Sequence, residues 1–131
     1  MNMNEYISKI EDLIQSCFLI SDYQLNTDRR TQDIAFISGR IDFIEGSFLD
    51  FKEFVEKTEK GIEKYKYGYN YRKASVLMFR YDNAPDPGAR HLNSFPHHKH
   101  TEDVNIIESH RVSFSEVLEE IQNRILKEWE Y

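Results

Sequence analysis

Tyr65-Lys66-Tyr67-Gly68-Tyr69-Asn70-Tyr71 places a tyrosine at every second position near the middle of the 131-residue chain. Side chains alternate between the two faces of a β-strand, so this period predicts a strand that carries its tyrosines on one face. Rows of tyrosines on strands usually pack in a core with their hydroxyl ends wet, although they can also stack nucleobases. We therefore expect a sheet built around residues 65–71, with most of the tyrosines packed in its core.

Alternating apolar residues continue on both sides of this segment. Residues 37–43 and 49–55 each predict a strand, and Gly46 between them suits the positive φ of a tight hairpin turn. Residues 76–81 predict the next partner strand, and residues 21–27 predict another strand before the hairpin. The middle of the chain is therefore predicted to be an antiparallel meander of four to five strands.

Amphipathic helices are predicted near both ends of the chain. Apolar residues at steps of three and four predict a helix over residues 4–17, and a capping box from Ser113 to Glu116 predicts the start of another. A chain of 131 residues with 40% apolar residues is the size of one domain, residues 1–131. We expect an α+β domain whose two helices pack on one face of the sheet, with the other face partly open near a long loop after residue 82.

Several classes of protein are excluded by the sequence. Its longest apolar stretches are far shorter than the ~20 residues that span a bilayer, and Met1-Asn2-Met3-Asn4-Glu5 lacks the features of a secretion signal. We therefore expect a cytoplasmic protein with no membrane association. Its single cysteine, Cys17, excludes an internal disulfide and a multi-cysteine zinc site.

Charge is distributed unevenly along the chain, whose net charge is −6. Residues 64–100 hold 7 Lys/Arg against 2 Asp/Glu, whereas residues 1–63 hold 7 against 13 and residues 101–131 hold 3 against 8. The basic segment would attract a polyanion. The alternative is that the acidic segments are solvated helix faces and the basic ones are strand edges, which would give the same distribution of charge. The predicted nucleic-acid contacts are Lys66, Arg72, Lys73, Arg90 and Lys99.

The densest group of functional side chains lies in residues 80–100, and three interpretations of it remain open. It forms a metal-independent phosphodiesterase site, in which one imidazole takes a 2′-hydroxyl proton and another protonates the leaving oxygen. Alternatively, His97, His98 and His100 bind a divalent ion together with Asp82, although the spacing matches no recognised zinc signature. In the third interpretation the group is structural: Asp82 and Asn83 cap turns, and the imidazoles bond to backbone carbonyls or water. The predicted site, with no metal and no cofactor, consists of His97, His98, His100, Arg80, Asp82 and Glu53.

Glu53 is included because alternation places it on the same strand face as Phe51 and Val55. Desolvation there would make its carboxyl group a usable proton donor or acceptor near neutrality. The alternative is that Glu53 pairs with a buried arginine, for which Arg80 is a candidate, or lies on an edge strand.

Two short motifs resemble the signature of TumE-type toxins of bacterial and archaeal toxin–antitoxin systems. They are Phe79-Arg80-Tyr81-Asp82-Asn83-Ala84-Pro85 and Phe95-Pro96-His97-His98-Lys99-His100. The glycine hairpin, the tyrosine strand and the closing helix occur in the same order, so the resemblance extends over most of residues 20–128. The family pattern often has a histidine pair directly after Asn-Ala-Pro, where this chain has Asp86 and Pro87.

The resemblance implies a growth-inhibiting toxin that is neutralised by a DNA-binding antitoxin encoded beside it. Together with the charge map and the histidines, it leads to a functional hypothesis: the toxin of a type II system that acts as a metal-independent ribonuclease or RNA-binding protein at its histidine-rich loop. The alternative is a non-catalytic module that binds a protein or nucleic acid on its aromatic sheet face. Enzymatic activity and homo-oligomerisation stay open at this level.

Overall fold

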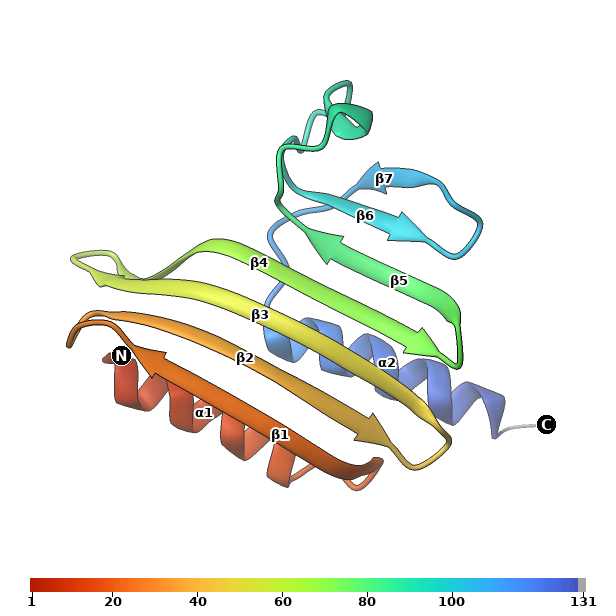
Figure 1. Ribbon diagram of the computed structural model, residues 1–131, viewed down its shortest axis with the longest axis horizontal. Helices are drawn as coiled ribbons and strands as arrows, with labels where there is room; N and C mark the ends of the chain where they lie inside the picture. The colour runs from red at the N-terminus through yellow and green to blue at the C-terminus, as the bar shows by residue number, and fades with distance from the viewer. Residues whose placement is uncertain (130–131) are drawn as a thin grey trace.

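Seven strands form one antiparallel sheet in the computed structural model, which describes residues 1–129 (Figure 1). The strands lie in the sheet in the same order as in the chain, so each pairs only with its neighbours in sequence. The elements in chain order are α1 (Met3–Gln15), β1 (Ile20–Arg29), β2 (Ile34–Phe43), β3 (Ser47–Thr58), β4 (Gly61–Lys73), β5 (Val76–Asp82), the one-turn helix η1 (Pro87–Ala89), β6 (His98–Thr101), β7 (Ile106–Glu108) and α2 (Phe114–Glu128).

The predicted meander is confirmed, but the predicted count of four to five strands is wrong. The two additional strands, β6 and β7, lie in the segment that the sequence predicts as a long loop. Both are short, and the polar sequence of β6, His-Lys-His-Thr, shows no apolar alternation. Pairing with the free edge of β5 makes β6 a strand, and such a tertiary effect leaves no periodic signal in the sequence.

Both helices cover the same face of the sheet, as predicted (Figure 1). Each begins with a complete capping box, Asn2 with Glu5 in α1 and Ser113 with Glu116 in α2. In residues 1–129, neither helix is long and apolar enough to cross a membrane. We call the uncovered face of the sheet the open face.

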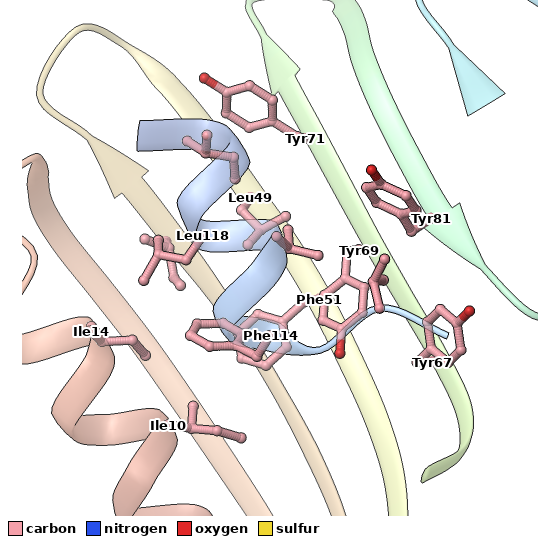
Figure 2. Packing of buried hydrophobic residues seen from close by; sticks show 14 of the residues in the cluster. Ile10, Ile14, Leu49, Phe51, Tyr67, Tyr69, Tyr71, Tyr81, Phe114 and Leu118 are labelled. Carbon is pink, nitrogen blue, oxygen red and sulfur yellow. The ribbon is translucent and has the colours of Figure 1, made fainter. Parts of the chain in front are cut away.

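The tyrosine row packs between the sheet and the helices. Tyr67, Tyr69 and Tyr71 are at most 2% exposed, and Phe114 of α2 packs against Phe51 with ring centroids 4.9 Å apart (Figure 2). Tyr65 is exposed and does not belong to the buried row, because the register of β3 and β4 shifts between Phe54 and Val55. The core interpretation of the row is therefore confirmed, and these three rings are not available to stack bases or bind a partner.

Gly39 in β2 lies where two neighbouring groups approach the backbone. A Cβ atom there would come within 2.7 Å of the Gln24 carbonyl oxygen and 2.9 Å of Phe51 Cε1. We expect Gly39→Ala to lower the free energy of unfolding by about 1–3 kcal/mol, measured by chemical denaturation. Gly68→Ala is the matched control, because its Cβ would meet its nearest atom at 3.6 Å. Equal losses in both variants would contradict the steric explanation.

Candidate functional site

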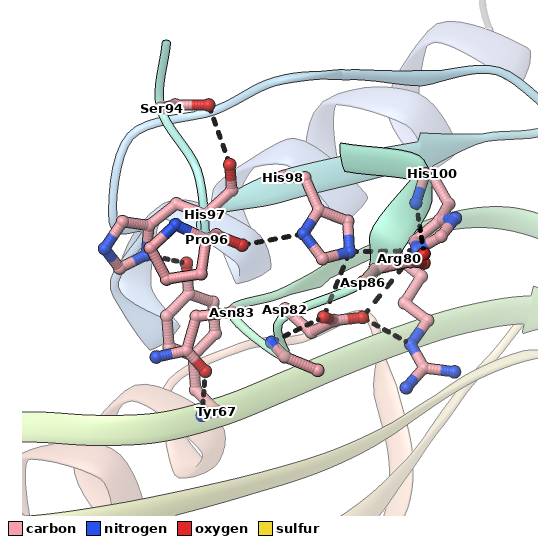
Figure 3. A network of polar contacts seen from close by, with 12 residues as sticks. Tyr67, Arg80, Asp82, Asn83, Asp86, Ser94, Pro96, His97, His98 and His100 are labelled. Carbon is pink, nitrogen blue, oxygen red and sulfur yellow. Dashed lines mark hydrogen bonds and ion pairs between the residues drawn. The ribbon is translucent and has the colours of Figure 1, made fainter. Parts of the chain in front are cut away.

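Antiparallel pairing of β5 with β6 brings four polar side chains together on the open face (Figure 3). Asp82 pairs with His98, and Arg80 pairs with His100. The residues that alternate with them face the helices: Tyr81 and Lys99 both contact Glu120 of α2. Arg80, Asp82, His98 and His100 therefore project from the opposite face, and we call these four residues the β5–β6 cluster.

The charged and imidazole atoms of the β5–β6 cluster meet around one point. His98 Nε2 lies 3.1 Å from Asp82 Oδ1 and 3.1 Å from His100 Nε2. His100 Nε2 is 3.8 Å from Asp82 Oδ2, which accepts a hydrogen bond of 2.9 Å from Arg80 Nε. Four of the six side chains that the sequence predicts as a site thus form one group around Asp82.

Burial divides the cluster into an inner and an outer half. The side chains of His98 and Asp82 are 1% and 6% exposed, whereas those of His100 and Arg80 are 25% and 44% exposed. Burial, followed by the neighbouring His98, lowers the pKa of His100, so its imidazole is neutral near pH 7. A ligand on the open face therefore meets one neutral imidazole and one guanidinium.

Backbone groups hold the inner half in place. The Ala84 N–H donates to Asp82 Oδ1 at 3.0 Å, and His98 Nδ1 donates to the Pro96 carbonyl oxygen at 2.8 Å. Asn83 joins the end of β5 to β4, because its side chain accepts from the Tyr67 N–H and donates to the Tyr65 carbonyl. Sequence reasoning identified the histidines and Asp82, but it missed these orienting groups, since main-chain donors and acceptors have no residue signature.

His97 lies apart from the cluster, although it is next to His98 in sequence. Its Nδ1 is 2.9 Å from the Tyr67 hydroxyl, and the two rings stack with centroids 5.8 Å apart. Burial lowers the pKa of His97 as well. His97 therefore packs against Tyr67 of β4. It does not belong to the group formed by Asp82, His98 and His100.

Glu53 lies on the helix-covered face, across the sheet from the cluster. It is fully buried, accepts hydrogen bonds from the hydroxyls of Tyr6 and Tyr69, and has Lys64 Nζ 4.0 Å away. Lys64 also donates to the Tyr69 hydroxyl and to the Val112 carbonyl. Burial raises the pKa of both tyrosines and lowers that of Lys64. Glu53 therefore has a buried basic partner, but the predicted arginine is wrong: the partner is Lys64, and Arg80 pairs with Asp82 instead.

A groove of about 440 Å³ on the open face reaches the cluster through Arg80. Its lining includes Asn26, Ser38, Arg40, Lys52, Asn70 and Arg80. Within residues 1–129, Asn70 Oδ1 is the one buried side-chain oxygen or nitrogen that has no hydrogen-bond partner. The groove thus offers amide and cationic groups to a polar ligand, although Asp50 also lines it and lies 3.8 Å from Arg40. Sequence reasoning missed the groove because its residues come from five strands, β1 to β5.

The five predicted nucleic-acid contacts fall on different faces. Lys66 and Arg72 alternate with the buried tyrosines of β4 and so belong to the open face, and Arg90 is exposed after η1. None of these three forms an ion pair in the described part of the chain. Lys73 and Lys99 lie on the helix side, paired with Glu45 at 2.9 Å and Glu120 at 3.0 Å.

Comparison with protein-family models identifies the family of this chain. A family model described as toxin TumE matches residues 10–125, which is most of the chain. The chain therefore belongs to the TumE toxin family, as the resemblance of its motifs predicts. Comparison with curated proteins and with solved structures gave no match.

Proposed function

We propose that this chain is the toxin of a type II toxin–antitoxin pair and that it inhibits growth by cleaving RNA at the β5–β6 cluster. The family supports the toxin role and, with it, an antitoxin partner. The observation that carries the RNA target is the position of Arg80, which is shared by the cluster and the open-face groove. An RNA target places the action of the toxin in the cytoplasm.

The cluster and groove together fit a strand of RNA. Arg80 is half-exposed and can neutralise a phosphate, while the groove beside it offers amide groups to a base or ribose. Lys66 and Arg72 extend the positive charge of the open face along β4 on either side of Gly68 and Asn70. A phosphodiester bound at Arg80 would therefore lie against His100, the exposed imidazole of the cluster.

RNA supplies its own nucleophile for this reaction. The 2′-hydroxyl loses its proton to a base in the site, the bond from O2′ to phosphorus forms and the bond from phosphorus to O5′ breaks. The leaving O5′ takes up a proton, so the products carry a 2′,3′-cyclic phosphate and a 5′-hydroxyl. Arg80 offsets the negative charge that builds up on phosphorus.

The sequence favours a metal-independent mechanism with two imidazoles as separate acid and base. Such a mechanism needs the imidazoles on opposite sides of one phosphorus atom. In the structure the Nε2 atoms of His98 and His100 instead face each other at 3.1 Å, and only His100 is accessible. The geometry therefore supports a cluster that acts as one unit, with Asp82 and His98 as its buried part.

The experiment for this proposal combines a chemical assay with a growth assay. Purified protein is incubated with a single-stranded RNA and with the same sequence carrying a 2′-deoxy sugar at each cleaved position. We expect cleavage of the RNA, 2′,3′-cyclic phosphate ends, and no cleavage at deoxy positions. Intact RNA in the presence of a protein preparation that inhibits growth would show that the toxin has another target.

Salt dependence of RNA affinity tests which face binds RNA. We expect Lys66→Ala and Arg72→Ala each to weaken binding and to reduce the slope of log affinity against log salt by about 0.7 per lost phosphate contact. The matched controls are Lys73→Ala and Lys99→Ala, which remove charges that are paired on the helix side. An equal change of slope in both sets would contradict binding on the open face.

A further inference from the structure

Three potential ligand atoms in the β5–β6 cluster point toward one another. They are one carboxylate oxygen of Asp82 and the Nε2 atoms of His98 and His100, and they all lie within 4.8 Å of one another. Around a divalent ion held at ~2.0–2.2 Å, the atoms of adjacent ligands lie about 3.0–3.4 Å apart. The distances from His98 Nε2 to the other two residues, both 3.1 Å, fall in this interval, whereas His100 Nε2 lies 3.8 Å from Asp82 Oδ2.

The proton on His98 provides an independent argument. A carbonyl oxygen only accepts hydrogen bonds, so the 2.8 Å contact with Pro96 fixes the proton of neutral His98 on Nδ1. Its Nε2 is then an acceptor that lies 3.1 Å from Asp82 Oδ1, which is also an acceptor, and 3.1 Å from His100 Nε2. A cation between these atoms would satisfy both contacts of His98 Nε2 at once.

A single proton on His98 would satisfy this arrangement poorly. A hydrogen atom on His98 Nε2 can point to Asp82 or to His100, but not to both. A metal ion instead accepts all three lone pairs at once. The hydrogen bond from His98 Nδ1–H to a carbonyl is also the contact that metal-bound imidazoles usually make with their surroundings.

We propose that Asp82, His98 and His100 bind one divalent first-row transition ion, for which Zn²⁺ is the reference probe. Two imidazoles and one carboxylate suit ions of this class. Three protein ligands leave a fourth position for water or substrate, which is the arrangement of catalytic zinc sites. Access to this position is from the open face, where His100 is exposed and Arg80 lies beside it.

The role of the ion rests on the proposed function, whereas its binding does not. If the cluster acts on RNA, the fourth position takes an oxygen of the phosphate or a water next to it. Zinc would lower the pKa of a bound water to about 7, so the hydroxide formed when this water loses a proton could take the 2′-hydroxyl proton in place of an imidazole and become water again. The ion thereby explains how two imidazoles that face each other can serve one reaction.

Zinc binding to the purified full-length protein tests the proposal without RNA. After treatment with a chelator and removal of the chelator, wild-type protein is expected to bind one Zn²⁺ per chain in calorimetry and elemental analysis. His100→Ala removes a half-exposed ligand, and Asp82→Asn keeps the shape of a buried one. Each is expected to weaken Zn²⁺ binding by more than about 100-fold, since even indirect partners of a ligand contribute roughly 10–100-fold.

His110→Ala is the matched control, because His110 is an exposed histidine paired with Glu116 away from the cluster. We expect its Zn²⁺ affinity to equal that of wild type. The proposal is overturned if wild type binds no stoichiometric Zn²⁺, or if binding is the same in His100→Ala and Asp82→Asn. Circular dichroism of each variant ensures that a loss of binding is not a loss of fold.

RNA cleavage by the zinc-loaded and zinc-free protein separates this proposal from the proposed function. If the protein binds Zn²⁺ but leaves RNA intact, the ion site is supported and the proposed RNA target is contradicted. If the protein cleaves RNA but binds no Zn²⁺, the RNA target is supported and the proposed ion site is contradicted. Cleavage that is lost with the chelator and restored by Zn²⁺ is the result that we expect.

Discussion

Growth inhibition is expected to disappear when His100 is replaced by Ala, while the domain stays folded. His100 is the accessible imidazole of the β5–β6 cluster, and its side chain is 25% exposed, so its truncation leaves little buried space. As proton acceptor or as metal ligand, it contributes at least about 100-fold to the rate of the chemical step. The measurement is growth after induced expression, together with circular dichroism of the purified variant.

His91→Ala is the control for this experiment. His91 is an exposed histidine of the same basic segment, and it follows η1 outside the β5–β6 cluster. We expect His91→Ala to remain fully toxic. If a folded His100→Ala variant still inhibits growth, the β5–β6 cluster has a structural role and the active site lies elsewhere on the molecule.

Replacing Glu53 by Ala is expected to lower the free energy of unfolding by about 3–5 kcal/mol, the cost of breaking a buried ion pair. The substitution leaves the hydroxyls of Tyr6 and Tyr69 without their acceptor and the buried ammonium of Lys64 without its counter-charge. Chemical denaturation measures this loss. Glu59→Ala, at the exposed end of the same hairpin, is expected to change stability by less than about 0.5 kcal/mol.

Glu53→Gln separates a structural from a catalytic role for this residue. The amide keeps the volume and one acceptor of the carboxylate, so part of the network with Tyr6 and Tyr69 survives. Because Glu53 lies across the sheet from the β5–β6 cluster, we expect Glu53→Gln to stay toxic at temperatures where it is folded. If a stable Glu53→Gln protein is no longer toxic, Glu53 has a catalytic role in addition to its structural one.

The parts of the fold that were predictable from sequence are those with a repeating apolar pattern. Period two in residues 65–71 and helical spacing near Ser113 identified β4 and α2, because burial of one face imposes that spacing. β6 has no such pattern, since its alternate residues are His98 and His100 on one side and Lys99 on the other. Its pairing depends on the edge of β5, which only the folded sheet provides.

The sequence predicted which residues of the candidate site lie together for some positions and not for others. Arg80 and Asp82 alternate on one strand, so their common face could be read from the sequence, and the histidine motif supplied their partners. Alternation also placed Glu53 on an apolar face, but the sequence could not tell which face of the sheet the helices would cover. Because Glu53 lies on the face that the helices cover, it pairs with Lys64 and is separated from the β5–β6 cluster.

The sequential order of the seven strands has a consequence for the order in which the toxin folds. Every strand pairing joins neighbouring segments, so each hairpin closes a short loop and little chain entropy is lost before contacts form. A sheet of this kind assembles rapidly, and β1 to β5 are available for pairing before the last helix has left the ribosome. The β5–β6 cluster forms only when β6 pairs with the edge of β5, so the proposed site is completed after the rest of the sheet, late in the synthesis of the chain.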